Sequence, residues 1–337
     1  MKKLLPLLLI IRLLTPCFAE TQKILYIKKP LYESVIRSMV FDDRGDLWIG
    51  SFGAGVWTVT KNEVKPVYDK SGKMPEFRVS KLWPDGTKMW AATAGKGLLF
   101  FDREKQDWFP AVPPSPEATM RYLHALLFTS QKDIFLGSVG SGAARLSQGA
   151  WHPIFENEGL TDDWINDAVE TPEGVWLAGS KGLALFQKDR ITKKIRPKIV
   201  GFSPFHWGDP ELNSLCASGA TLFIGTISDG VFRISPEGKE KKIRETAGNV
   251  QAVKLWKNSL WACGPGKLWK SEDPFAEKPI ASGVIGPWEK DCHFKSLAVS
   301  PSNTLYIGTF DGKIYETTDG ASFSLILTFA EDRFKRP

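Results

Sequence analysis

Side chains that donate hydrogen bonds recur about eleven residues before each aromatic residue of a repeated motif. They are Arg37, Arg78, His124, Asn166, Asn213, Gln251 and Lys295. A one-residue shift in alignment would place Val79 in this set instead of Arg78, and Trp164 and Trp207 stand in neighbouring segments. Rigid aromatic rings beside polar donors are typical of ligand or protein recognition. We therefore take these nine residues as a candidate binding site, with an ordinary solvated start of each strand as the alternative.

The residues that could support catalysis do not form a recognisable motif. The four histidines are far apart in the sequence: His124, His152, His206 and His293. No H-E-x-x-H motif, phosphate-binding loop or nucleophile elbow is present. The paired acids Asp42-Asp43 and Asp162-Asp163 lie in predicted turns, where aspartate favours local backbone hydrogen bonds. We therefore predict no catalytic residue, no metal site and no cofactor, and keep a glycan hydrolase or lyase as the alternative.

The cysteines leave two interpretations open. Cys216, Cys263 and Cys292 follow the predicted leader segment, and their spacing matches no metal site. Cys263 stands at a small-residue position of the repeated motif, which favours a packing role. A disulfide between Cys263 and Cys292 is the other interpretation, since the leader predicts an oxidising compartment.

The elements that must position the candidate site come from an internal repeat. A motif of one aromatic residue, one aliphatic or small residue, one small residue and a glycine-rich turn occurs seven times, as in "LWIGSFGAGVW" (47–57) and "LYIGTFDGKIY" (305–315). Its aromatic residues are Trp48, Trp90, Phe135, Trp176, Phe223, Trp261 and Tyr306. Their spacing of about 43 residues indicates a repeat architecture in which each unit buries its apolar face against the next.

Each repeat has the pattern of four short strands. The aromatic residue and the small residue two positions later share one face of a strand that is apolar on both faces. A strand-like run precedes this strand, and two follow the glycine turn. Seven such units predict an all-β fold, a seven-bladed β-propeller of four-stranded antiparallel blades.

One repeat resembles a known family. "WHPIFENEGLTDDWINDAVETPEGVWLAGSKGLALF" (151–186) is similar to the two-component-regulator propeller repeat, with matches at Gly159-Leu160 and at Gly174, Val175, Trp176 and Leu177. The other copies match mainly around the aromatic residue, and "TTDGASF" (317–323) resembles a shortened Asp-box. The resemblance covers about residues 35–330 and implies a periplasmic, ligand-binding sensor propeller.

The N-terminus predicts export. "MKKLLPLLLIIRLLTPCFAE" has a basic start, an apolar stretch and small residues before Glu20, as a bacterial signal peptide does. We expect cleavage after Ala19 and a periplasmic or secreted protein; a lipoprotein acylated at Cys17 is the alternative. The predicted organisation is a signal peptide at 1–19, an N-terminal segment with an extra edge strand at 20–34, the propeller at 35–330 and a tail at 331–337.

The charge balance excludes some partners. Removing Lys2, Lys3 and Arg12 with the signal peptide leaves 41 basic and 38 acidic residues, too even for a nucleic-acid or polybasic membrane surface. We expect a monomer without a membrane span that recognises a protein partner or a small or glycan ligand. The sequence thus predicts an extracytoplasmic binding or sensing module, with an envelope-complex assembly or scaffold factor as a further alternative.

Overall fold

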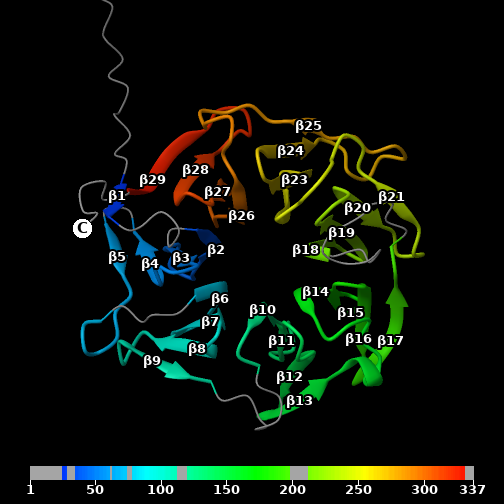
Figure 1. Cartoon of the computed structure of the whole chain (residues 1–337), viewed down its shortest axis with the longest axis horizontal. Coiled ribbons are helices and arrows are strands. Elements are labelled where there is room, and N and C mark those ends of the chain that lie inside the picture. Colours follow the sequence, from blue (N-terminus) through cyan, green and yellow to red (C-terminus); the bar gives the residue numbers. More distant parts are fainter. Residues whose placement is uncertain are drawn as a thin grey trace, which may run out of the picture.

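The computed structural model describes residues 25–28, 35–60, 63–73, 78–111, 120–197 and 212–330. Seven antiparallel sheets are arranged around one central axis (Figure 1). In these residues the helical content is a short 3-10 turn, Glu156–Glu158. The predicted seven-bladed β-propeller of four-stranded blades is therefore confirmed.

Each blade is a four-stranded meander whose first strand lies nearest the axis. Blade one comprises β2 (Ile36–Phe41), β3 (Leu47–Ser51), β4 (Val56–Val59) and β5 (Val64–Pro66). Blade two comprises β6 (Arg78–Asp85), β7 (Lys88–Ala94), β8 (Gly97–Asp102) and β9 (Asp107–Pro110). Blade three comprises β10 (Leu123–Phe128), β11 (Ile134–Ser138), β12 (Ala143–Ser147) and β13 (Ala150–Ile154). Blades four and five comprise β14 (Ile165–Thr171), β15 (Gly174–Gly179), β16 (Gly182–Gln187) and β17 (Arg190–Ile195); and β18 (Leu212–Ser218), β19 (Thr221–Thr226), β20 (Val231–Ile234) and β21 (Glu240–Lys242). Blades six and seven comprise β22 (Ala252–Trp256), β23 (Ser259–Gly264), β24 (Lys267–Ser271) and β25 (Ser282–Gly283); and β26 (Phe294–Val299), β27 (Leu305–Thr309), β28 (Lys313–Thr317) and β29 (Ser324–Ala330).

The repeated aromatic residues all lie on the second strand of their blade, as the repeat predicts. The small residue two positions later receives an apolar side chain from the first strand of the next blade. A Cβ atom added to Gly137 would come within 2.5 Å of Ile165, and one added to Gly308 within 2.6 Å of Ile36. At these glycines neighbouring blades therefore approach too closely to admit a side chain.

A β-bulge follows this contact at the start of the innermost strand. In β2, for example, Ile36 pairs with Ser51 and Ser38 pairs with the adjacent Gly50, so Arg37 has no partner of its own. The same register shift occurs in five more innermost strands, β6, β10, β14, β18 and β26. A bulge re-aims one side chain out of the regular alternation. The extra residue can thus face the central channel while the apolar residue before it stays buried between blades.

The ring closes between the seventh and first blades. The strand β1 (Leu25–Lys28) pairs in parallel with β29 and forms a fifth strand on the outer edge of blade seven (Figure 1). Blade one packs on the same blade through Trp57, whose ring lies 5.6 Å from that of Phe329, centroid to centroid. Because β1 precedes β2 in the chain, it links the last blade covalently to the first.

Deletion of residues 20–30 tests this closure. We expect the melting temperature to fall by a few degrees, because the deletion exposes the edge of β29 and removes the link between blades seven and one. Thermal unfolding followed by circular dichroism measures the change. An unchanged melting temperature would show that β1 contributes nothing to ring closure.

Candidate functional site

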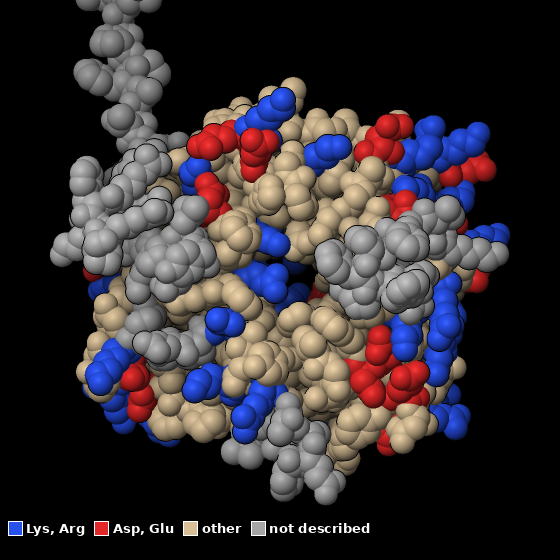
Figure 2. Space-filling model, in the orientation of Figure 1, with Lys and Arg blue, Asp and Glu red and all other residues tan. Residues whose placement is uncertain are grey.

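The innermost strands of all seven blades line a central cavity of about 620 Å³. The bulged residues, with the corresponding Gln251 of blade six, stand at the end of the cavity where these strands begin. We call this set the mouth ring: Arg37, Ser80, His124, Asn166, Asn213, Gln251 and Lys295. Lysine and arginine atoms are visible at the central opening in the space-filling view (Figure 2).

The structure brings most of the sequence-predicted residues to this cavity. Six of them belong to the mouth ring, and Trp164 also lines the cavity. Arg78 does not, because Val79 is the buried residue of blade two and Ser80 is the bulged one. Arg78 instead lies beside the ring, with its guanidinium carbon 5.4 Å from the centre of the Phe52 ring. Trp207 lies outside the described residues.

The amides of the mouth ring are fixed by hydrogen bonds. Asn166 Nδ2 donates to the Leu212 carbonyl at 3.0 Å, so its Oδ1 atom faces Trp164 and His124. That oxygen accepts a hydrogen bond from Trp164 Nε1 at 2.8 Å and lies 3.3 Å from His124 Nδ1. Asn213 Nδ2 donates to the Val250 carbonyl at 3.0 Å. These contacts tie blades three, four, five and six to one another at the mouth ring.

The two cations of the mouth ring lie against aromatic rings. The Arg37 guanidinium carbon is 5.2 Å from the centre of Phe52, and Lys295 Nζ is 5.7 Å from the centre of Phe310. Lys295 Nζ also donates to Gln251 Oε1 at 3.0 Å. Burial, together with the positive charge of Arg37, lowers the pKa of Lys295 from its ordinary value to about 8.

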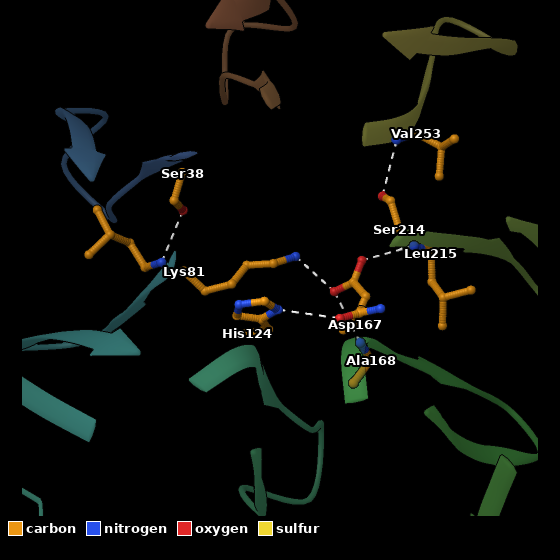
Figure 3. A network of polar contacts seen from close by, with 10 residues as sticks. Ser38, Lys81, His124, Asp167, Ala168, Ser214, Leu215 and Val253 are labelled. Atoms are coloured by element: carbon orange, nitrogen blue, oxygen red, sulfur yellow. Dashed lines mark hydrogen bonds and ion pairs between the residues drawn. The ribbon is translucent and has the colours of Figure 1, made fainter. Parts of the chain in front are cut away.

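Two charged residues that the sequence analysis did not select lie just below the mouth ring. Lys81 Nζ forms an ion pair with Asp167 Oδ1 at 2.8 Å, and the lysine chain extends past His124 to reach it (Figure 3). The residue that follows the bulge in the intervening blade is Ala125, whose side chain packs in the core between blades three and four. Lys81 and Asp167 each stand one residue after a bulged residue, and this shared position is the sequence signal that could have identified them.

The same layer joins the blades through backbone contacts (Figure 3). The Ser38 hydroxyl oxygen accepts from the Leu82 N–H at 2.9 Å, and that of Ser214 accepts from the Val253 N–H at 3.1 Å. Asp167 Oδ2 accepts from the Leu215 N–H at 2.8 Å. Asp167 therefore both links blade four to blade five and neutralises the charge of Lys81.

The remaining sequence-level questions concern cysteine, metal and membrane chemistry. Cys263 and Cys292 are both buried free thiols, so the structure contains no disulfide between them, and burial raises the pKa of each to about 12. In the described segments, no group of three or more histidine, cysteine or acidic side chains is placed to hold a metal ion. A helix long and apolar enough to cross a bilayer is likewise absent from that part of the chain.

Comparison with known proteins shows that the fold of this chain is similar to that of several solved structures. No family model and no curated protein matches the sequence. The structure is similar to the extracellular domains of two B. thetaiotaomicron proteins described as hybrid two-component systems. For BT4673 the TM-score is 0.70 at 17% identity over 89% of this chain and 39% of that one, and for BT3049 it is 0.64 at 14% identity over 84% and 39%.

A lyase shares the same architecture. Virginiamycin B lyase from Staphylococcus aureus, in a catalytically inactive variant solved with quinupristin, has a TM-score of 0.66 at 11% identity over 86% of this chain and 97% of that one. The chain spans about two fifths of the two extracellular domains named above. At these identities the comparisons establish the propeller fold, and the site must be interpreted from its own residues.

Proposed function

We propose that this protein is an extracytoplasmic binding or sensing propeller that takes a ligand or a segment of a protein partner at the mouth ring. The observation that carries the proposal is the repeated bulge, which delivers one side chain from successive blades to the opening of a cavity of about 620 Å³. Ligand pockets in proteins commonly have this size and a few convergent polar groups.

The location and the sensing role are supported by the structural comparisons. The similar BT4673 and BT3049 propellers are extracellular domains of proteins described as two-component systems. The leader-like sequence of residues 1–19 is consistent with export as well. The enzyme alternative receives less support, because Asp167 is the one carboxylate among the described cavity residues and it is engaged by Lys81 and a backbone N–H.

A variant that narrows the mouth tests the proposal. Ser80 has the smallest side chain of the mouth ring and no hydrogen-bond partner for its buried hydroxyl in the described structure. Ser80→Tyr should therefore occupy the opening without removing a charge. We expect any ligand found by thermal-shift screening of oligosaccharides and small metabolites to bind this variant at least tenfold more weakly, as measured by calorimetry.

The matched control is Ser282→Tyr on the exposed outer strand β25. It adds the same group far from the axis and should leave binding unchanged. Circular dichroism and the melting temperature establish that both variants fold. A ligand that binds Ser80→Tyr as tightly as the parent protein would place its site elsewhere on the propeller.

A further inference from the structure

We propose that the ligand of the mouth ring carries an oxyanion group (a carboxylate, sulfate or phosphate) that is bound between Arg37 and Lys295 with help from His124 and Ser80. This inference rests on the proposed function and adds the chemical class of the ligand. Its basis is the excess of hydrogen-bond donors and positive charge in the cavity.

The charges that line the cavity do not balance. The described lining residues include four cations, Arg37, Lys81, Lys254 and Lys295, against a single carboxylate, Asp167. The carboxylate is already paired with Lys81 at 2.8 Å. Within the described part of the chain, Arg37 and Lys295 have no carboxylate partner; their contacts are Phe52, Phe310 and the neutral amide of Gln251. The mouth ring is therefore left with two uncompensated cations.

Arg37 and Lys295 lie where water has limited access to screen their charges. Both are partly buried, and they belong to β2 and β26, which pack against each other across the ring closure. Arg37 lowers the pKa of Lys295, as expected for like charges held close together. An anion bound between them would relieve this repulsion and gain charge-assisted hydrogen bonds from both. The planar guanidinium of Arg37 suits the two oxygen atoms of a carboxylate or sulfate.

His124 and Ser80 complete the set of donors. The contacts with Trp164 and Leu212 identify the Asn166 atom facing His124 as the amide oxygen, which can only accept, so this contact requires a proton on His124 Nδ1. Nε2 is then the atom that gains a proton when the ring becomes charged. Burial and the nearby Arg37 and Lys81 lower the pKa of His124, opposed by its hydrogen bond with Asn166. The Ser80 hydroxyl is buried and has no partner in the described structure, and rotation about its Cα–Cβ bond would turn it toward the cavity that this residue lines, where it could donate to the same anion.

Calorimetric titration at constant ionic strength tests the inference with sulfate, citrate, a galacturonic acid trimer and neutral maltotriose. Sulfate and citrate represent free small anions, and the acidic trimer represents a carboxylate on a glycan. We expect at least one anion to bind the parent protein. The double variant Arg37→Met, Lys295→Met should bind it about a hundredfold more weakly, since each charge-assisted hydrogen bond contributes about tenfold. The matched control, Arg190→Met with Lys239→Met, removes two exposed outer cations and should bind as the parent does.

The pH dependence provides a second readout. Sulfate does not titrate between pH 5 and 9, so its affinity reports the charge of the protein. We expect affinity to decrease as the pH rises, first as His124 loses its proton below its ordinary pKa and again near pH 8 as Lys295 does. The other groups near Lys295 are Arg37 and Cys263, and the thiol stays neutral because its pKa is about 12. In the double variant the decrease near pH 8 should be absent.

Three results would overturn the inference. One is the failure of every oxyanion to bind at millimolar concentration; another is equal binding by the double variant and the parent protein. The third is a neutral ligand whose affinity falls in Ser80→Tyr but not in the double variant. That third result would leave the mouth ring as the binding site and reject only its preference for anions, so the two proposals fail separately.

Discussion

Replacing Asp167 with alanine is expected to lower the free energy of unfolding by about 1–3 kcal/mol. The carboxylate is buried, accepts a hydrogen bond from the Leu215 N–H at 2.8 Å and pairs with Lys81 at 2.8 Å. Alanine would leave the backbone N–H groups of Leu215 and Ala168 without this acceptor, and Lys81 without its counter-charge, in a channel that is already basic. Urea unfolding measures the loss.

Two further variants separate the charge of Asp167 from general disruption. Asp167→Asn keeps one oxygen acceptor at this position and should lose less stability than alanine. It also removes the one described carboxylate of the cavity and should therefore increase the affinity for sulfate. Glu63→Ala breaks an exposed ion pair with Lys65 and should change stability by less than about 0.5 kcal/mol. Equal losses in Asp167→Ala and Glu63→Ala would refute the structural role of Asp167.

Replacing Lys295 with methionine is expected to have the opposite effect and to stabilise the protein at neutral pH by about 1–3 kcal/mol. Folding places this ammonium group in a partly buried position beside Arg37, which lowers its pKa to about 8. Below pH 8 the lysine is charged in both the folded and unfolded states, so the full cost of burying the charge is present. Methionine retains most of the apolar chain without that cost.

The pH dependence of stability provides the control for this prediction. Between about pH 8 and the ordinary lysine pKa of 10.5 the unfolded state binds more protons, so the stability of the parent protein should rise with pH in this range. The Lys295→Met variant should lack that rise, whereas Lys239→Met on an exposed turn should retain it. If Lys295→Met instead destabilises the protein at pH 7, burial of the Lys295 charge does not cost stability. The inference that this charge is retained for binding would then be refuted.

A gain in stability combined with a loss of anion binding would explain why the chain keeps Lys295. Residues that are costly to fold are common at binding sites, where function and stability compete. The same comparison distinguishes the mouth ring from the paired cation below it. Lys81 is compensated by Asp167 and contributes to the structure, whereas Arg37 and Lys295 have no carboxylate partner among the described residues.

The sequence by itself determined the architecture. The seven aromatic residues and the small residues that follow them fixed the number of blades and the identity of each second strand, because these side chains fill the same space between blades in every repeat. Most of the mouth ring could also be predicted, since a polar residue after a buried apolar one marks the start of each innermost strand. Such features are local and repeat with a fixed period, so a single chain displays them plainly.

Only the tertiary structure shows which polar residues line the channel together and how their charges balance. A bulge shifts the register by one residue, so only the pairing of β6 with β7 shows that Ser80 takes the place expected for Arg78. The ion pair of Lys81 and Asp167 joins residues 86 positions apart, on blades two and four, across the intervening third blade. The near balance of charge in the sequence likewise gave no indication of a basic channel. Local charge depends on which side chains the closed ring brings together, and that is set by contacts between blades rather than by composition.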